Sequence, residues 1–335
     1  MKVTLKDLAK EFGCSVTTVS RALKDNNTIS LELRKKVKKR AEELGYIPNI
    51  VAGSMRTGQT KTIAVILQDL RNPFFSILAK YIEEFASNQG YSTFFITTSE
   101  LIDREIEAVY TAIGKNVDGI LLLPNQKDTR SIEILRRYKI PHILVGRYFS
   151  NLDTDYVIAN DQKGSYLVTK HLIEKGHQRI LFLNSYMYIS SAYLRLEGYK
   201  QAFLEANLPF HENDIIIVST DRGEACEVIN SIFSKKQEYT AVFTYCDVIA
   251  FETIFTLNEL GYHVGKDIAV AGVDNIHSDI ILPIKITSAS YSRKDMAYEA
   301  VNLLIKRINE GINNESGDHY EHRVIDISLS LGQTT

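Results

Sequence analysis

Short apolar runs recur through most of the chain, and a longer segment that mixes apolar and charged residues follows each of them. The eight runs read "TIAVILQ", "STFFITT", "GILLLP", "HILVGR", "RILFLN", "DIIIVS", "AVFTY" and "IAVAGV". The segments between them, such as residues 73–89 and 162–175, are expected to be helices. Unbroken apolar strands that alternate with helices are typical of parallel sheets covered on both faces. The pattern predicts an α/β protein, built either as one closed barrel or as two doubly wound sheets.

Length and composition narrow the class of protein. The 335 residues leave room for two or three compact units, and 24% charged residues with a net charge of −2 are typical of a globular protein. Three widely spaced cysteines form neither a disulfide framework nor a metal-binding motif, which indicates a reducing compartment. No apolar run approaches the roughly 18–20 residues that span a membrane, and charges interrupt the N-terminal "MKVTLKDLAKEFG". We expect a cytoplasmic protein without a signal peptide, a membrane contact or a metal site.

The near-neutral total conceals an uneven distribution of charge. Residues 1–61 contain 13 basic and 6 acidic side chains, a net charge of +7, and the remaining residues carry a net charge of −9. A basic segment attached to an acidic body is typical of a protein that binds a polyanion. A solvated basic helix is the other interpretation of such a charge run.

The basic segment itself has the pattern of three helices. "TLKD" has the spacing of a capping box, "SVTTVSRAL" opens with a capping serine, and a third helical pattern runs from about residue 30 to Gly45. Two short helices joined by a tight turn and supported by a third form a helix-turn-helix, whose second helix enters the DNA major groove. On that helix Arg21 is suited to guanine, Thr17 to either base type, and the Val16 methyl groups to a thymine methyl.

Three segments together resemble the lactose/galactose repressor (LacI/GalR) family: "VTLKDLAKEFGCSVTTVSRAL", "LGYIPNIVAGSMRTGQTKTIAVI" and "NPFF". The resemblance implies a homodimeric, sequence-specific DNA-binding repressor with two Rossmann-like subdomains of the periplasmic-binding-protein type. The implied domains are a helix-turn-helix domain at residues 1–46 (motif about 5–24), a hinge helix and linker at 47–60, and an effector-binding and dimerisation core at 61–335. Within the core, the N-subdomain takes about 61–160 plus 291–320. The C-subdomain takes about 161–290 plus 321–331, with its last strand at 324–331.

The resemblance also implies which residues contact a palindromic operator. In the helix-turn-helix domain these are Thr4, Ser15, Val16, Thr17, Ser20, Arg21 and Lys24, and in the hinge they are Asn49, Ala52 and Met55. On composition alone the hinge is a flexible linker, because a helix of seven or eight residues is well below the ~12–15 that are marginal in water. The family pattern instead predicts a helix that orders on DNA, with Met55 as an apolar wedge in the minor groove. Gly53 departs from that pattern and weakens such a helix.

Polar residues at the carboxyl ends of the strands predict a ligand-binding cleft. The residues implied by the family pattern are Phe74, Phe75, Arg147, Arg195, Arg222, Asp247, Asp274 and Tyr291. The aspartates favour a neutral polyol, whereas the arginines favour a negatively charged ligand such as a sugar phosphate. The effector is therefore expected to be a carbohydrate, with its phosphorylation left open. Gly146 and Cys246 stand where the family often has hydroxyl-binding side chains.

The sequence thus predicts a repressor of carbohydrate-utilisation genes, which an effector controls by shifting the population of two core arrangements. A regulator of the same kind that responds to a phosphorylated carrier protein is the main alternative. A transport-type sugar-binding protein is disfavoured, because such a protein would have no use for the basic head. An α/β enzyme with a regulatory head is disfavoured because the chain has no Walker, dinucleotide-binding, zinc-protease or nucleophile-elbow motif. No cofactor is expected.

Overall fold

The structure is a computed structural model that describes residues 3–47, 58–220, 223–235, 238–313 and 319–335. The chain divides into two compact units, Met1–Thr60 and Lys61–Thr335. We call the first unit the head and the second the core, and describe each by itself. The predicted hinge residues Asn49, Ala52 and Met55, and the cleft residue Arg222, lie outside the described residues.

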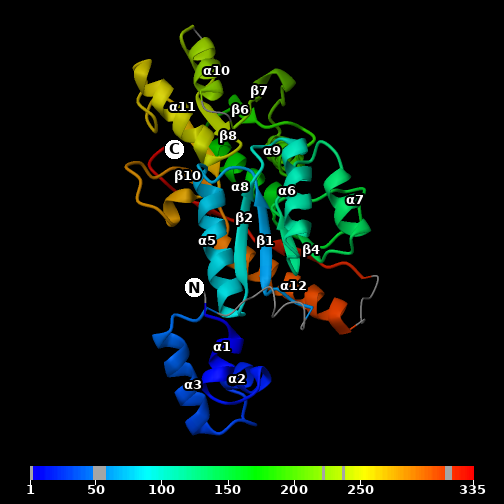
Figure 1. Cartoon of the computed structure of the whole chain (residues 1–335). Coiled ribbons are helices and arrows are strands. Elements are labelled where there is room, and N and C mark those ends of the chain that lie inside the picture. Colours follow the sequence, from blue (N-terminus) through cyan, green and yellow to red (C-terminus); the bar gives the residue numbers. More distant parts are fainter. Residues whose placement is uncertain (1–2, 48–57, 221–222, 236–237, 314–318) are drawn as a thin grey trace. The chain divides into compact units, whose positions relative to one another are not determined.

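The described part of the head contains three helices, drawn in blue in Figure 1: α1 (Leu5–Glu11), α2 (Val16–Leu23) and α3 (Leu31–Glu43). The capping box at Thr4 is present, because its hydroxyl accepts the Asp7 backbone N–H and the Asp7 carboxylate accepts the Thr4 backbone N–H. Leu8, Val19 and Val37, one from each helix, are fully buried against one another. The apolar stripe of each short helix therefore packs onto the other two, which is the helix-turn-helix arrangement predicted from the sequence.

Two six-stranded sheets organise the core. The first has the spatial order β11-β5-β4-β3-β1-β2, and all its pairs are parallel. The second has the order β12-β10-β9-β8-β6-β7, parallel except for the antiparallel pair of β12 and β10. In both sheets the chain starts at an inner strand, adds the second strand on one side of it, and adds the later strands outwards on the other side. This order is that of a doubly wound sheet, so the core is two such units and the closed barrel is excluded.

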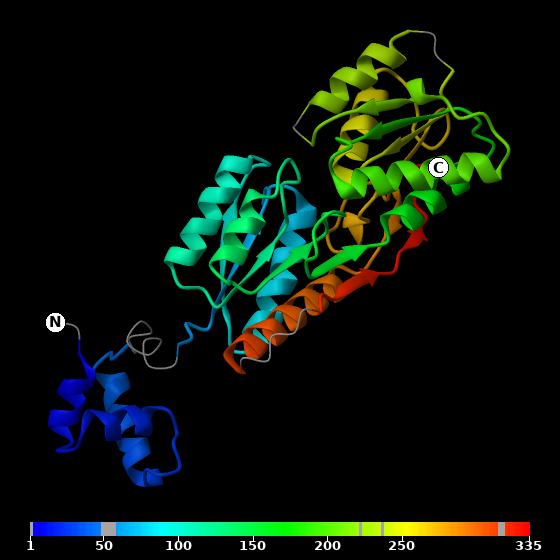
Figure 2. The same ribbon diagram turned by 90° about the vertical axis from the view of Figure 1, so that its right-hand side faces the viewer.

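The first subdomain is the unit built on the first sheet, and the second subdomain is the unit built on the second (Figures 1 and 2). The strands of the first subdomain are β1 (Thr62–Leu67), β2 (Ser92–Thr97), β3 (Gly119–Leu122), β4 (His142–Val145), β5 (Tyr156–Ala159) and β11 (His322–Ile325). Its helices are α5 (Pro73–Asn88), α6 (Ile102–Gly114), α7 (Arg130–Arg137) and α12 (Arg293–Asn313).

The second subdomain repeats this plan. Its strands are β6 (Ile180–Asn184), β7 (Ile215–Ile217), β8 (Ala241–Thr244), β9 (Ala269–Val273), β10 (Thr287–Ser290) and β12 (Ser328–Ser330). Its helices are α8 (Asp161–Glu174), α9 (Ser190–Glu205), α10 (Glu224–Phe233) and α11 (Asp247–Glu259), with two short 3-10 turns, Glu212–Asp214 and Ile276–Ser278.

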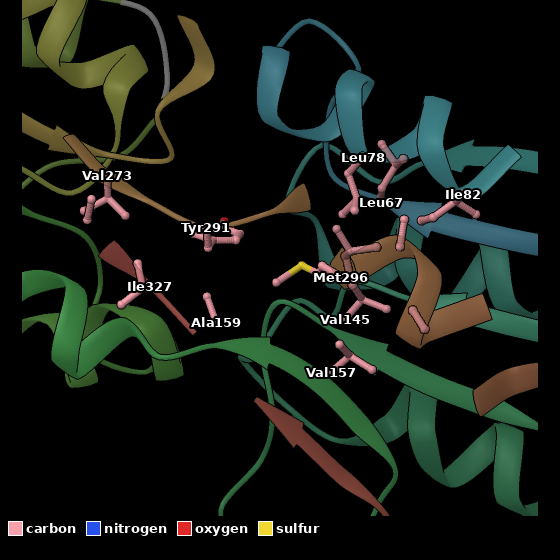
Figure 3. Close-up of a cluster of buried hydrophobic side chains, with 14 of the residues drawn as sticks. Leu67, Leu78, Ile82, Val145, Val157, Ala159, Val273, Tyr291, Met296 and Ile327 are labelled. Carbon is pink, nitrogen blue, oxygen red and sulfur yellow. The ribbon is translucent and has the colours of Figure 1, made fainter. Parts of the chain in front are cut away.

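The inner strands of each sheet are buried on both faces, as the unbroken apolar runs predicted, whereas the edge strands are partly exposed. In β1, Val65 packs among residues of α5 and α12, whereas its neighbour Ile66 packs among residues of α6 and α7. The cluster containing Val65 continues into the second subdomain. Figure 3 shows Met296 and Tyr291 between the side chains of the two subdomains, with Val273 on the far side. The segments that cross between the subdomains are therefore packed with apolar side chains.

The C-terminal segment corrects the predicted subdomain boundary. We expected residues 321–331 to belong to the C-subdomain with one last strand at 324–331. The segment instead forms two strands: β11 pairs in parallel with β5 of the first sheet, and β12 pairs with β10 of the second. Residues 326 and 327 make the crossing, and Figure 2 shows this red segment running from one subdomain to the other. Residues 322–325 belong to the first subdomain, because the main-chain groups of β11 pair with β5 and form the outer strand of the first sheet.

The structure also contains two strands that neither the apolar runs nor the family resemblance predicted, β5 and β10. β10 reads "TSAS", and its hydroxyl side chains are buried in hydrogen bonds, such as that of Ser288 with Asp247. In the described part of the chain, no helix is long and apolar enough to cross a membrane.

Candidate functional site

The exposed side of α2, together with Lys24 directly after it, carries five of the seven residues predicted to read DNA in the helix-turn-helix domain. Val16, Thr17, Arg21 and Lys24 are exposed and Ser20 is half-buried, while Val19 and Ala22 are buried on the opposite side. This division is required of a recognition helix, because one face must pack on its own domain while the other remains free for base edges. The contacts of these residues with DNA remain predictions.

Two of the predicted DNA-binding residues have a structural role of their own. The Thr4 hydroxyl caps α1, and the Ser15 hydroxyl accepts the Thr18 backbone N–H to cap α2. Capping is by itself a sufficient reason for a hydroxyl at both positions. A DNA contact would use their remaining hydrogen-bonding capacity.

The basic side chains of the head differ in their availability to phosphate. On α3, Lys36 is paired with Glu32, Lys38 with Asp25, and Arg40 with both Glu11 and Glu43. Within the described residues, Arg21 of α2 and Lys24, which directly follows α2, form no ion pair. The positive charge that is free for a polyanion therefore includes the two basic residues at the end of the recognition helix.

The carboxyl ends of the strands in both subdomains meet around one small cavity of about 60 Å³. Of the residues predicted to bind effector, Phe74, Phe75, Arg147, Arg195, Asp274 and Tyr291 line it. The wall also includes residues that the sequence did not single out, among them Asn72, Glu100, Asp161, Ser191 and Tyr245. A polar cavity at the edge where parallel strands end is the expected position of a ligand site in a doubly wound fold.

Arg195 is buried in the wall and is paired with Asp161. Its Nε and Nη2 lie 2.8 and 2.7 Å from one carboxylate oxygen of Asp161, and its guanidinium lies 4.4 Å from the centre of the Tyr245 ring. Burial is the largest single effect and lowers the pKa of Arg195, but the nearby acidic groups, Asp161 first among them, together outweigh it and raise the pKa overall. Gly198 permits the close packing of α8 on α9 that forms this pair, since a Cβ there would lie 2.1 Å from the Gln162 carbonyl oxygen.

Arg147 is paired in the same way in the first subdomain. Its two terminal nitrogens lie 2.7 and 3.1 Å from the two carboxylate oxygens of Glu100, and it also donates to the Pro124 carbonyl. Burial is the largest single effect and lowers the pKa of Arg147, but the charge and hydrogen bonds of Glu100, together with the neighbouring Tyr245, raise it overall. Both arginines of the described wall therefore have a carboxylate partner before any ligand binds.

Asp274 is the third carboxylate of the wall and is held in a strained backbone conformation. Its φ angle is 107°, a region that residues with a side chain rarely adopt. The Tyr291 hydroxyl donates to one carboxylate oxygen at 3.2 Å. Burial raises the pKa of Asp274 to about 6, against the opposing charges of Arg195 and Arg293. This side chain is positioned to accept a hydrogen bond from a ligand.

Asp247 does not line the cavity, contrary to the prediction. It is fully buried, and its two oxygens accept hydrogen bonds from the Ile276 backbone N–H at 2.9 Å and the Ser288 hydroxyl at 2.7 Å. Burial, together with the nearby charge of Asp274, raises its pKa to about 7. The carboxylate turns away from the cavity because it ties α11 to the loop after β9.

Sequence reasoning missed the carboxylates that pair with the arginines for identifiable reasons. Asp161 is the first residue of the helix after β5, a strand that was not recognised, and Glu100 follows the end of β2 by three residues. Both positions are carboxyl ends of parallel strands, so recognising β5 would have added Asp161. Among the described residues, no cluster of His, Cys, Asp and Glu is suited to a metal ion.

A helix-turn-helix head and a doubly wound core with a buried polar cavity define a DNA-binding regulator with a ligand-binding core. Comparisons with known proteins agree. The family model for periplasmic binding proteins and the sugar binding domain of the LacI family matches residues 60–332, and that for bacterial regulatory proteins of the lacI family matches residues 4–49.

Curated relatives and solved structures point to the same family. The HTH-type transcriptional repressor PurR of Pasteurella multocida (strain Pm70) is 32% identical over 308 residues, 92% of each chain. That of Histophilus somni (strain 129Pt) is 30% identical over 329 residues, 98% of this chain and 97% of the relative. The lac repressor dimer bound to operator and the anti-inducer ONPF has the same fold, with a TM-score of 0.83 at 22% identity over 100% of this chain and 99% of that one. The chain belongs to the LacI family: it is a DNA-binding transcriptional repressor with an effector-binding core, and it is not an enzyme.

Proposed function

We propose that the effector of this repressor is a neutral carbohydrate bound in the core cavity. The observation that carries the proposal is the pairing of both wall arginines with carboxylates 2.7 Å away. Asp274 adds a third negative charge, so the described wall has more negative than positive charges. A phosphate group would meet these carboxylates, whereas sugar hydroxyls can donate to them. Phe74 and Tyr291 supply apolar surface for one face of a ring.

Solved regulators of the same fold include one in complex with cellobiose and one, from Enterococcus faecium, with bound ribose. These likenesses are below 25% identity and support only the fold, so the argument for a carbohydrate depends on the wall itself. A flat nucleobase that stacks on Phe74 is the competing small molecule, and it belongs in any ligand screen.

We further propose that the repressor acts as a homodimer on a palindromic operator in the compartment that holds the DNA, the cytoplasm. Members of the family bind operators as dimers. On the core, the half-buried Phe251 of α11 and Leu282 line one hollow. Phe255, one turn along α11 from Phe251, is 64% exposed, and Ile281, next to Leu282 in the chain, is fully exposed. An exposed apolar patch of this kind is typical of a protein interface, and a second copy of the chain would cover it. We call these four residues the α11 patch.

Regulation then follows from differential binding. The cavity wall includes Phe74 of the first subdomain and Arg195 and Asp274 of the second, so a ligand that contacts both binds one arrangement of the subdomains better than another. Such a ligand shifts the population of core arrangements, and the hinge transmits this shift to the head.

A thermal-shift screen of the full chain tests the proposal. The ligands are neutral sugars, the matching sugar phosphates and nucleobases. At a concentration of 100 times its Kd, a ligand stabilises the folded state by about 2.7 kcal/mol, which raises the Tm by several degrees. We expect a neutral sugar to give this shift, and Asp274→Asn, which tolerates the same backbone conformation, to abolish it.

The other outcomes are informative. Stabilisation by a sugar phosphate alone would show that the charge argument is wrong, and the arginine at position 222 would then be the first residue to test. Stabilisation by a nucleobase alone would replace the carbohydrate with a flat aromatic effector. If no small molecule stabilises a folded chain, control by a phosphorylated carrier protein becomes the better hypothesis.

A further inference from the structure

A second hollow, larger than the cavity, lies where the two subdomains meet. Its volume is about 550 Å³. The first subdomain contributes residues 126–129 and 148–151, and the second contributes the loop after β6 and the first turn of α9. We call this hollow the tyrosine groove, after Tyr148, Tyr188 and Tyr193 in its wall.

The tyrosine groove presents apolar surface to solvent. Tyr188 is 42% exposed and Tyr193 is 52% exposed. Met187, which precedes Tyr188 in the loop after β6, is 40% exposed. The ring of Tyr188 stacks on that of Tyr186, with ring centres 5.5 Å apart. The Lys127 ammonium lies 6.0 Å from the centre of the Tyr188 ring. Tyrosine rings with a polar rim, held in place by stacking, are typical of binding surfaces.

The groove and the effector cavity are lined by residues that are neighbours in the chain. Tyr148 and Ser190 line the groove, and their neighbours Arg147 and Ser191 line the cavity. At this boundary, Gln126 accepts from the Ser190 backbone N–H at 2.8 Å, and the Ser190 hydroxyl accepts from the Tyr148 backbone N–H at 3.2 Å. These hydrogen bonds join the two subdomains, and the hydroxyl groups of a bound ligand can replace them.

Size favours a ligand that uses both hollows. The cavity alone, at about 60 Å³, is far smaller than the roughly 300–1,000 Å³ of typical ligand pockets. The cavity and the groove taken together fall within that range. A sugar ring has an apolar face that stacks on an aromatic ring and hydroxyl edges that bond to amides and carboxylates. The groove offers Gln126, Asn151 and Asp128, whose carboxylate is paired with Arg130, for those edges.

We propose that the tyrosine groove binds the outer units of an effector longer than a monosaccharide, so that the natural ligand is an oligosaccharide that starts in the cavity. This inference depends on the carbohydrate effector proposed above. Tyr188 and Tyr193 stack on the outer sugar units, and Gln126 and Ser190 exchange their mutual hydrogen bonds for bonds to the ligand.

Calorimetry on the full chain compares monosaccharides with their trisaccharides: glucose with maltotriose and cellotriose, xylose with xylotriose, and mannose with mannotriose. We expect one trisaccharide to bind at least roughly tenfold more tightly than its monosaccharide, which corresponds to one good aromatic contact. Tyr188→Ala and Tyr193→Ala should each reduce this ratio and leave the monosaccharide affinity unchanged. Tyr138→Ala is the matched control, since Tyr138 is 51% exposed at the end of α7 and does not line the groove.

Three outcomes would overturn the inference. Equal affinity for a monosaccharide and its trisaccharide means that the groove is unused, while the carbohydrate proposal stands. A ratio unaffected by both groove variants, or reduced as much by Tyr138→Ala, means that longer sugars bind elsewhere. If no sugar of any length binds the folded chain, the proposed carbohydrate function fails and the inference fails with it, which leaves the groove to a protein partner.

Discussion

The substitution Asp161→Asn tests the charge argument at the centre of the effector site. Asp161 and Arg195 are buried, with side chains only 4% and 6% exposed, and two guanidinium nitrogens share one carboxylate oxygen. Asparagine keeps the size of the side chain and one oxygen acceptor, but it removes the negative charge. The guanidinium of Arg195 would then stand unpaired in the cavity wall, still bonded to the Tyr245 carbonyl.

Two effects of opposite sign are expected. Breaking a buried ion pair by removing one partner costs on the order of 3–5 kcal/mol of folding free energy, and the retained acceptor places Asp161→Asn near the lower end. The freed guanidinium can instead bind an anionic ligand. A hydrogen bond to a charged group contributes about 1.5–3 kcal/mol, so the affinity for a sugar phosphate should rise by roughly ten- to a hundredfold.

Urea unfolding followed by far-UV circular dichroism measures the first effect at fixed protein concentration, and calorimetry with a sugar and its phosphate measures the second. Asp326→Asn is the control, because Asp326 pairs with Lys163 on the surface with a side chain 78% exposed, and little change is expected there. A destabilisation below about 1 kcal/mol would mean that water solvates the pair. Loss of stability without any gain in phosphate affinity would refute the view that Asp161 is what excludes an anionic effector.

Further predictions concern pH, DNA and assembly. Burial raises the pKa of Asp274 to about 6 and that of Asp247 to about 7, from an ordinary value of 3.8. The folded core therefore holds these protons more tightly, so its unfolding free energy should fall as the pH rises from about 4 to about 7, and urea midpoints for Asp247→Asn should show a shallower slope. Arg21→Ala should cost about 1–3 kcal/mol at the operator and little on unrelated DNA, whereas equal losses in a mobility-shift titration would make Arg21 a phosphate contact. Operator affinity should also fall steeply with salt, with a log–log slope of roughly −0.9 for each neutralised phosphate. Phe255→Asp, in the α11 patch, should shift the chain towards monomer in sedimentation, and an unchanged mass would place the dimer interface elsewhere.

The sequence alone determined the layout of the protein. Apolar runs such as "TIAVILQ" and "AVFTY" identified eight strands of the doubly wound sheets, because a strand buried on both faces must be continuously apolar. Capping residues located the three helices of the head, because the unpaired N–H groups of a helix start need specific side chains. Ligands bind where parallel strands end, and this rule together with the family resemblance predicted the effector residues. Six of them line one cavity in the structure.

Strands without an apolar run could not be read in this way. The hydroxyl side chains of β10 are compatible with burial only because Asp247, Asn275 and the C-terminal residues Gly332 and Thr335 supply their hydrogen bonds. The switch of the C-terminal segment from the first sheet to the second likewise depends on which strand edge is free for pairing. The residue types between Ile325 and Ser328 do not predict this switch.

Only the tertiary structure decided which charges face the cavity and how they are compensated. Asp247 and Asp274 both follow a strand of the second sheet, yet one carboxylate ties α11 to a loop and the other lines the cavity. Arg195 is neutralised by Asp161, 34 residues earlier, because α8 and α9 pack closely at Gly198. A sequence pattern gives the order and burial of residues along an element. The direction of a side chain and its partner across the chain are set by the packing of elements against one another, and here that packing determines the charge that an effector meets.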